Sequence, residues 1–172
     1  MNTSMLSGKT ALVTGSTSGI GLGIARSLAQ QGANIVFNGF GDAQQIEKLY
    51  REVGQEFGVQ TAYHNADMSK PAEIEAMMKF ADEKFGGVDI LVNNAGILRD
   101  AQLVKWKDGA VAGTMSDEAW DKVLGVNLKG AFRLSTLFAE RMKVAGSGSI
   151  INVSSIAAVQ PGYSDRDKAM TV

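Results

Sequence analysis

Short runs of β-branched or apolar residues alternate along this chain with longer stretches in which apolar positions recur at helical spacing. Such alternation is typical of repeated strand–helix–strand units, which build a parallel sheet with helices on its faces. We therefore expect an α/β fold, a doubly wound parallel sheet, in one domain spanning residues 1–172. The pattern predicts about five strands, at residues 10–14, 34–38, 60–64, 88–92 and 149–153.

Helices are predicted between these strands, where apolar residues recur every three or four positions and form one face. The first stripe comprises Ile46, Leu49, Tyr50, Val53 and Phe57, and the second Ile74, Met77, Met78, Ala81 and Phe85. The longest helix is predicted from Ser116 to Lys143, with a broad apolar surface at Trp120, Val123, Leu124, Leu128, Ala131, Leu134 and Phe138. We interpret these stripes as core facing the sheet. Residues 105–114 are polar and glycine-rich and predict a surface loop.

Composition narrows the classes of protein that fit. The sequence is 45% hydrophobic and 20% charged, which indicates a folded domain rather than a disordered chain. A formal net charge of −1, with basic residues scattered singly, argues against nucleic acid and anionic membranes as partners and favours a small-molecule substrate. The chain has no cysteine and no apolar run long enough to span a bilayer, so we expect a cytoplasmic protein.

One segment carries a recognisable chemistry. Thr14–Gly21 directly follows the first predicted strand and opens the next helix, with glycines at 15, 19 and 21. Glycines there permit a tight turn and let backbone amides approach a pyrophosphate at the positive end of the helix. Close packing of helix on sheet is the alternative reason for glycine. The position between strand and helix favours a phosphate loop, and hence a Rossmann-like fold.

The spacing Gly-x-x-x-Gly-x-Gly differs from the usual Rossmann fingerprint, and three further motifs follow it in order: Asn93–Gly96, Asn127 within Val126–Gly130, and Asn152–Ser155. Together they resemble the short-chain dehydrogenase/reductase family, from about Ser7 to Tyr163. The part before Gly96 resembles 3-hydroxybutyrate dehydrogenases, and the later part resembles 3-oxoacyl-acyl-carrier-protein reductases. A recombinant of two relatives and a single divergent gene both fit this change.

The resemblance implies a dinucleotide-binding domain and a set of cofactor-binding residues. These are Gly15, Ser18, Ile20 and Gly21 at the pyrophosphate, Asp67 and Met68 at the adenine, and Asn94, Ala95 and Gly96 on the ribose side and at the sheet centre. Physically, the Asp67 carboxylate follows a strand end and can accept a hydrogen bond from the adenine amino group. It can also cap a helix that starts after Lys70.

Cofactor choice depends on the end of the second strand, Asn38–Asp42. An acidic residue there accepts from the ribose 2′-hydroxyl, whereas a basic residue favours a 2′-phosphate. The stretch contains no Arg or Lys, and Asp42 would repel a phosphate if it turned inward, so NAD is expected over NADP. Asp42 can equally cap the helix that begins at Ala43.

The resemblance also implies catalytic roles. Ser155 matches the serine that hydrogen-bonds the reacting oxygen, and Asn127 the asparagine that holds a relay water; a turn after the strand is the alternative role for Ser155. The family's Tyr-x-x-x-Lys pair falls at Lys168 and Val172 and is missing, so the chain is expected to be truncated relative to the family. Tyr163 and Lys168 are five residues apart, about 140° on a helix, and would not share a face.

These features predict an NAD(P)-dependent oxidoreductase that transfers hydride between nicotinamide and a secondary alcohol or ketone such as a 3-hydroxy acid. The alternatives are an inactive nucleotide-binding module and a fragment that only assembles. An unprotected fifth strand and the apolar long helix favour a homo-oligomer. His64, the single histidine, lacks partners at ligand spacing, so we expect a solvated strand end and no metal.

Overall fold

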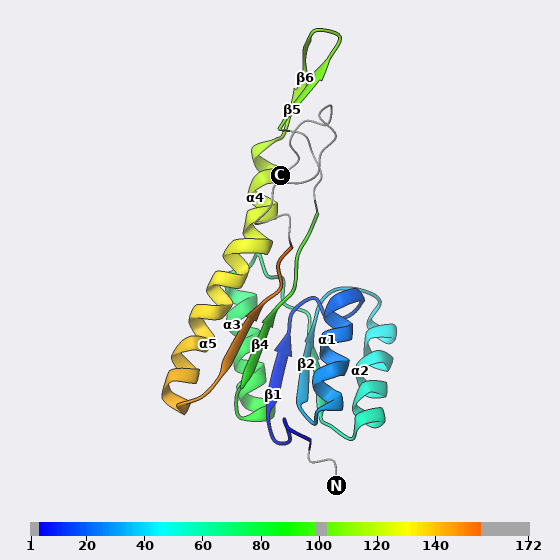
Figure 1. The fold of residues 1–172 in the computed structure, drawn as a ribbon, viewed down its shortest axis with the longest axis vertical. Coiled ribbons are helices and arrows are strands. Elements are labelled where there is room, and N and C mark those ends of the chain that lie inside the picture. The colour runs from blue at the N-terminus through cyan, green and yellow to red at the C-terminus, as the bar shows by residue number, and fades with distance from the viewer. Residues whose placement is uncertain (1–3, 99–102, 156–172) are drawn as a thin grey trace.

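A computed structural model of the protein describes residues 4–98 and 103–155. The first part of the chain forms β1 (Thr10–Val13), α1 (Gly19–Gln30), β2 (Asn34–Asn38), α2 (Ala43–Phe57), β3 (Thr61–His64), α3 (Pro71–Phe85) and β4 (Ile90–Asn93). The second part forms β5 (Val104–Lys107), β6 (Ala110–Thr114), α4 (Asp117–Leu124), the π-helical η1 (Gly125–Gly130), α5 (Ala131–Ala145) and β7 (Ser149–Asn152). Figure 1 shows these elements arranged around one sheet, with the β5–β6 pair projecting away from it.

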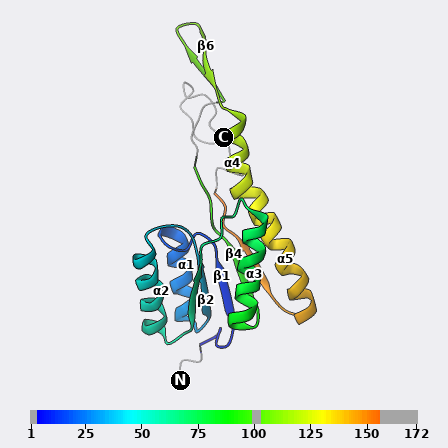
Figure 2. The ribbon, with the colours of Figure 1, turned by 180° about the vertical axis from the view of Figure 1, so that it is seen from behind.

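The main sheet is parallel, with the strand order β3-β2-β1-β4-β7. The chain builds outward from β1 in one direction and then crosses to β4, which is the doubly wound pattern. Helices α1 and α2 cover one face, and α3 and α5 cover the other, as the two opposite views show (Figures 1 and 2). The predicted fold and its five strands are confirmed, each strand lying within two residues of its predicted bounds.

The burial of β1 on both faces of the sheet explains its continuous apolar run. Successive side chains point to opposite faces of a sheet. Ala11 and Val13 pack under α1 and α2, whereas Leu12 packs under α3 and α5, and none of the three is exposed. A strand covered on both faces needs apolar residues at every position, as in β4 beside it.

The segment predicted as a surface loop is a β-hairpin. Strands β5 and β6 pair in antiparallel fashion and are exposed along their length. Asp108 and Gly109 both have positive φ, 52° and 80°, the backbone conformation of a type I′ turn, which an Asp-Gly pair favours. The loop prediction was therefore wrong in its secondary structure.

The predicted long helix is present as three consecutive segments, α4, η1 and α5. Ser116 begins it, its hydroxyl accepting a hydrogen bond from the Ala119 amide at 3.2 Å. The π-helical turn ends at Gly130, where a side chain would collide with the Met68 carbonyl oxygen. Because η1 is wider than an α-helix, it changes the direction of the side chains that it carries, Asn127 among them.

Both predicted stripes on α2 and α3 face the core, and Val53, Ile74 and Met77 are almost completely buried. The apolar surface of the long helix is only partly covered. Leu134 and Phe138 are fully buried in the core cluster, but Leu128 and Phe132 remain 63% and 67% exposed. In the part of the chain described, no helix combines the length and apolar character that crossing a membrane requires.

Candidate functional site

A cavity of about 540 Å³ lies where the carboxyl ends of the strands meet. Parallel strands place the loops that follow them at one edge of the sheet, and here those of β1 to β4 all contribute. The structure brings together all nine residues predicted to bind the cofactor. They are Gly15, Ser18, Ile20, Gly21, Asp67, Met68, Asn94, Ala95 and Gly96.

The loop after β1 brings its backbone close to this cavity. Gly15 and Gly19 have φ of +62° and +55°, a backbone conformation that residues other than glycine rarely adopt. Gly21 is buried, and a Cβ there would overlap the Gly15 carbonyl oxygen and the Asn94 amide. Ser18 precedes α1, and its side chain does not cap that helix. The first amides of α1 are therefore available to an anion in the cavity.

Thr14 ties this loop to the loop after β4. Its hydroxyl accepts hydrogen bonds from the amides of Asn94 and Ala95, each at 3.0 Å, and donates to the Val92 carbonyl. In the opposite direction, the Asn94 side-chain amide donates hydrogen bonds to the carbonyls of Thr14 and Gly15, at 2.9 and 3.1 Å. These bonds fix the spacing between the glycine loop and Asn94–Gly96.

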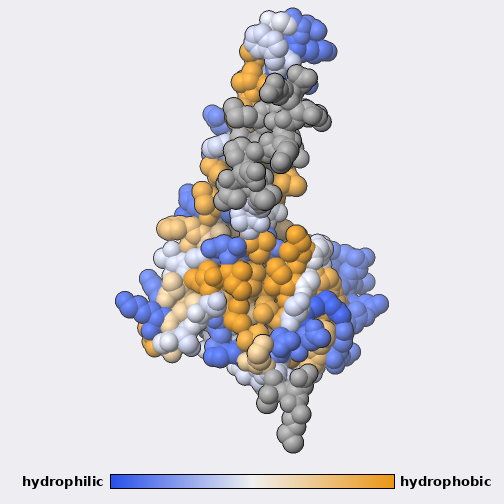
Figure 3. All heavy atoms as spheres, viewed as in Figure 1, coloured by the Kyte–Doolittle hydropathy of each residue, from blue (hydrophilic) through white to orange (hydrophobic). Residues whose placement is uncertain are grey.

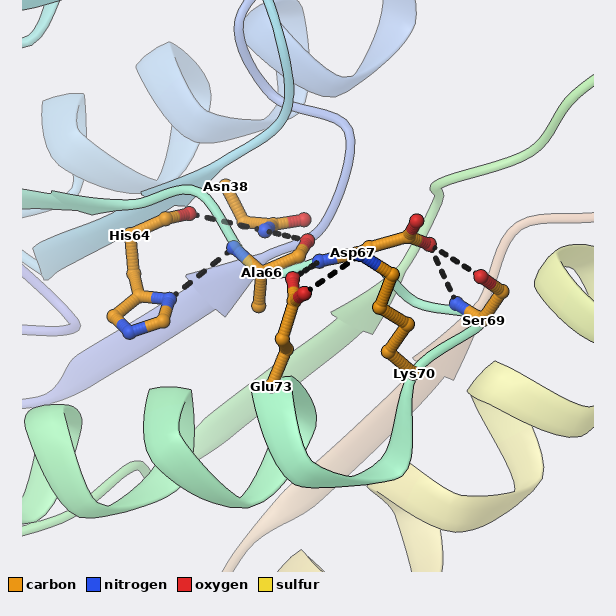
Figure 4. Close-up of polar contacts among 7 residues, drawn as sticks. All are labelled: Asn38, His64, Ala66, Asp67, Ser69, Lys70 and Glu73. Carbon is orange, nitrogen blue, oxygen red and sulfur yellow. Dashed lines mark hydrogen bonds and ion pairs between the residues drawn. The ribbon is translucent and has the colours of Figure 1, made fainter.

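Asn38 makes the corresponding link between β2 and β3, as Figure 4 shows. Its side-chain amide donates to the carbonyls of His64 and Ala66 at 3.0 and 2.9 Å. The oxygen of the same side-chain amide, Oδ1, accepts a hydrogen bond from the Gly15 backbone amide at 3.4 Å. One buried side chain thus positions the glycine loop and the segment that carries Asp67.

Asp67 sits in a turn stabilised by its own carboxylate. Oδ1 accepts from both the amide and the hydroxyl of Ser69, at 2.8 and 2.7 Å, while Glu73 accepts from the Asp67 amide at 2.8 Å (Figure 4). Burial opposes ionisation, but the Ser69 hydrogen bonds and the charges of Lys70 and Lys122 outweigh it, so the pKa of Asp67 is lowered. Lys70 is the residue that precedes α3, so the helix-cap role considered for Asp67 is wrong.

Asp42 takes the second of the two roles considered for it. Its carboxylate accepts from the Gln45 amide at 2.9 Å and caps α2. It does not line the cavity. Asp42 is therefore not placed to accept from a ribose hydroxyl or to repel a phosphate.

His64 is half-buried rather than solvated, so that expectation was wrong. Its Nδ1 accepts from the Ala66 amide at 3.2 Å, and its ring lies 5.3 Å from that of Phe80. Burial lowers the pKa of His64, opposed by the charge of Glu73, and the bond to Ala66 requires an unprotonated Nδ1. Within residues 4–98 and 103–155, no three His, Cys, Asp or Glu side chains are grouped to hold a metal ion.

A second cavity of about 580 Å³ adjoins the first, and Met68 and Asn94–Gly96 line both. Asn127 lines the second from η1, and its side chain donates to the Ile97 carbonyl at 3.0 Å and accepts from the Ile97 amide at 2.8 Å. The structure therefore shows Asn127 holding the loop after β4. Ser155 lies exposed just beyond β7. Tyr163, Lys168 and Val172 fall outside the described residues.

Comparison with known proteins identifies the family. The sequence matches the short chain dehydrogenase family over residues 9–165. The chain belongs to the short-chain dehydrogenase family. The predicted resemblance is confirmed, and members of this family bind a nicotinamide cofactor.

Curated relatives of both predicted kinds are found. The chain is 52% identical over 151 residues to D-beta-hydroxybutyrate dehydrogenase of Cupriavidus necator, covering 88% of this chain and 54% of the relative. It is 37% identical over 159 residues to the 3-oxoacyl-acyl-carrier-protein reductase FabG of Staphylococcus aureus, covering 91% of this chain and 61% of that one. The chain thus spans little more than half the length of these relatives.

A solved structure supports the fold. A metagenomic short-chain oxidoreductase in complex with NADP superposes with a TM-score of 0.76 at 35% identity. The match covers 91% of this chain and 66% of that one. The residues present here also fit such a cofactor, because the glycine loop and the amino end of α1, which no side chain caps, line a cavity that Asp67 and Asn94 also line.

The sequence did not single out several residues of this short-chain dehydrogenase that line the first cavity. They include Thr17, Phe40, Ile97, Lys122 and Val126. The glycines on both sides of Phe40 were a usable local signal. Val126 belongs to a motif noted in the sequence, but its place in the lining and that of Lys122 could not be found this way, because only the packing of the long helix brings them to the cavity.

Proposed function

We propose that this chain forms the cofactor-binding part of a dehydrogenase that transfers hydride between a nicotinamide nucleotide and a secondary alcohol or ketone. The observation that supports this most is the cavity at the carboxyl ends of the strands, where all nine expected binding residues meet. A 3-hydroxy acid is the substrate class we favour, because relatives 52% and 47% identical to this chain are named D-beta-hydroxybutyrate dehydrogenase.

The proposed roles follow from position and chemistry. Gly15, Gly21 and the amino end of α1 would hold the pyrophosphate through backbone amides and partial positive charge. Asp67 is ionised at neutral pH and would accept from the adenine amino group, beside Met68. The bound nicotinamide would supply or accept the hydride.

On the catalytic side, Ser155 would hydrogen-bond the reacting oxygen. Asn127 would maintain the loop after β4 through Ile97, and the second amide hydrogen and second oxygen lone pair of its side chain would hold a relay water. Both roles are proposed from the family motif.

We propose NAD as the cofactor. No Arg or Lys occurs in Asn38–Asp42, so a 2′-phosphate would find no cation from this segment. Among the described residues that line the cavity, Lys122 is the cation, and its charge acts on Asp67. The solved relative holds NADP, so the two nucleotides must be compared directly.

A nucleotide-binding module without turnover is a second candidate, favoured by one observation. Lys168 occupies the position thirteen residues after Ser155, where the family has its catalytic tyrosine. A lysine side chain has no phenolic hydroxyl to exchange a proton with the reacting oxygen.

One experiment separates the candidates. NADH and NADPH are titrated by fluorescence, and oxidation of 3-hydroxybutyrate is then assayed with the bound nucleotide. Tighter binding of NADH than of NADPH, with turnover, supports the dehydrogenase; binding without turnover leaves the module. Failure to bind either nucleotide contradicts both and leaves an assembling fragment.

We also propose that the chain forms a homo-oligomer. Ile151 and Val153, in or beside edge strand β7, are 43% and 38% exposed, and Phe132 and Leu128 of the long helix are more exposed still. Hydrophobic residues also gather over the face of the sheet shown in Figure 3. Burying such surface stabilises association. A monomer at micromolar concentration in sedimentation would contradict this.

The proposed cofactor favours a cytoplasmic location, which imaging of a tagged chain would test.

A further inference from the structure

Phe40 is a large aromatic residue in an unusual position. It lies just beyond β2, its side chain is 66% exposed, and it lines the cavity at the carboxyl ends of the strands. An exposed aromatic ring forgoes the stabilisation that burial would give it. Because Phe40 belongs to a binding cavity, the exposed surface indicates a ring that a ligand covers.

The backbone around Phe40 is held in place. The Thr17 hydroxyl donates to the Phe40 carbonyl at 3.1 Å, and the Tyr63 hydroxyl donates to the Gly39 carbonyl at 2.7 Å. Gly39 and Gly41 have φ of +151° and +153°, in the region that favours glycine. A Cβ on Gly39 would lie 2.6 Å from the Thr17 hydroxyl oxygen. The loop is therefore fixed from both the phosphate loop and β3.

Phe40 and Asp67 lie at neighbouring strand ends. Asn38, two residues before Phe40, donates to the carbonyl of Ala66, the residue before Asp67. Strands β2 and β3 are paired up to Asn38 and His64, so the two loops leave the sheet side by side. The cavity thus has an aromatic side chain on one loop and a carboxylate acceptor on the next.

This combination suits a purine base better than a charged group. The segment Asn38–Asp42 supplies no cation for a phosphate. A planar base, in contrast, gains from contact with an aromatic ring and can donate its amino hydrogens to a carboxylate. We propose that the side chain of Phe40 packs against the adenine ring of the cofactor and so contributes directly to its affinity. This inference rests on the proposed function and adds a binding residue to it.

The test measures affinities by calorimetry for three ligands: NAD, AMP, and nicotinamide mononucleotide, which lacks adenine. We expect Phe40→Ala to weaken NAD and AMP roughly 5- to 100-fold, the range for loss of one base–aromatic contact. The mononucleotide should change less than about twofold, and Phe40→Tyr, which keeps the ring, should stay within about threefold of wild type for all three.

Trp106→Ala is the matched control, because Trp106 is also 66% exposed but lies on the β5–β6 hairpin. It should leave all three affinities unchanged. Wild-type AMP affinity in Phe40→Ala would overturn the inference while leaving the proposed function intact. Equal weakening of AMP and the mononucleotide would also overturn it, by indicating a general distortion. Failure of the wild type to bind any of the three would overturn both proposals.

Discussion

The two ends of the parallel sheet both carry cavities, but the two are built differently. The cavity at the amino ends has about 700 Å³ and is lined by charged residues of α3, α5 and the turn before β4. Three of the four charged residues that line it form ion pairs: Arg141 binds Asp82 at 2.6 Å, and Asp89 binds Lys9 at 2.7 Å. The cavity at the carboxyl ends has about 540 Å³ and is lined mainly by the loops after β1 to β4, with glycines at five positions.

This difference, rather than size, is the reason we propose the cavity at the carboxyl ends as the binding site. Paired charges at the amino end join helices and strands and have already satisfied one another, so a ligand there would have to displace them. At the carboxyl end the first amides of α1 have no intrahelical acceptor, and a cofactor can supply one. Substitutions at the two ends should therefore separate ligand binding from stability.

The largest effect is expected from Gly21→Ala. A methyl group there would overlap the Gly15 carbonyl and the Asn94 side chain, which cannot both retreat without opening the phosphate loop. NADH affinity should fall by about 100-fold or more, equivalent to about 2.7 kcal/mol, as measured by fluorescence titration. Gly23→Ala is the matched control, because a Cβ there meets nothing within 4 Å and Ala favours the helix by about 0.5–1 kcal/mol.

Thr14→Val should lower both stability and affinity. The substitution keeps the shape of the side chain but removes the acceptor for the amides of Asn94 and Ala95. Unsatisfied buried groups of this kind cost about 1–3 kcal/mol each, so we expect about 2–4 kcal/mol less stability in urea unfolding. Thr14→Ser retains the hydroxyl and should retain NADH binding. Wild-type stability of the valine variant would count against this cross-link.

Asp89→Ala tests the opposite end. It removes the ion pair with Lys9 and the acceptor for the buried Thr10 amide, which Asp89 binds at 2.9 Å. We expect a loss of about 1–3 kcal/mol in urea unfolding, mostly from the amide, since exposed ion pairs contribute little. NADH affinity, measured where the variant is folded, should stay within about twofold of wild type. A large loss of affinity would contradict the separation of the two ends.

Asp42→Ala should cost about 1 kcal/mol, the usual effect of losing a helix cap, whereas Asp42→Asn should cost less because it still accepts from Gln45. The ratio of NAD to NADP affinity should not change in either variant, because Asp42 faces α2 rather than the cavity. Calorimetric titration with both nucleotides checks this. A change in this ratio in favour of NADP would show that Asp42 does take part in the choice of cofactor.

The smallest effect concerns pH. The pKa of Asp67 is lower in the folded protein than its ordinary value of 3.8, so its ionised form stabilises the fold above that pH. This contribution is lost as the pH falls from about 3.8 through the folded pKa. We expect Asp67→Asn to lower stability by about 0.5 kcal/mol at pH 7, a small amount because solvent screens a partly exposed carboxylate. In urea titrations at pH 2.5 this difference in stability should be smaller. A constant difference would contradict it.

The sheet and the loops that line the cavity at its carboxyl ends could be predicted because their signals are local. Each buried strand needs apolar residues on both faces, and the turn at Gly15 requires a positive φ. The hairpin was missed although Asp108 and Gly109 carried its turn signal, since its composition resembles a loop. The roles of Asp42 and His64 depend on which neighbouring amide each side chain reaches. Spacing alone does not determine that choice.

We propose that the cofactor binds at the carboxyl ends of the strands. Hydrogen–deuterium exchange with and without saturating NADH tests it most directly, because both cavities are observed in one experiment. We predict slower exchange in residues 15–22, 66–69 and 94–97, with no change in residues 86–89 and 141–147. Slower exchange only in residues 86–89 and 141–147, or no slowing in any segment, would contradict this proposal.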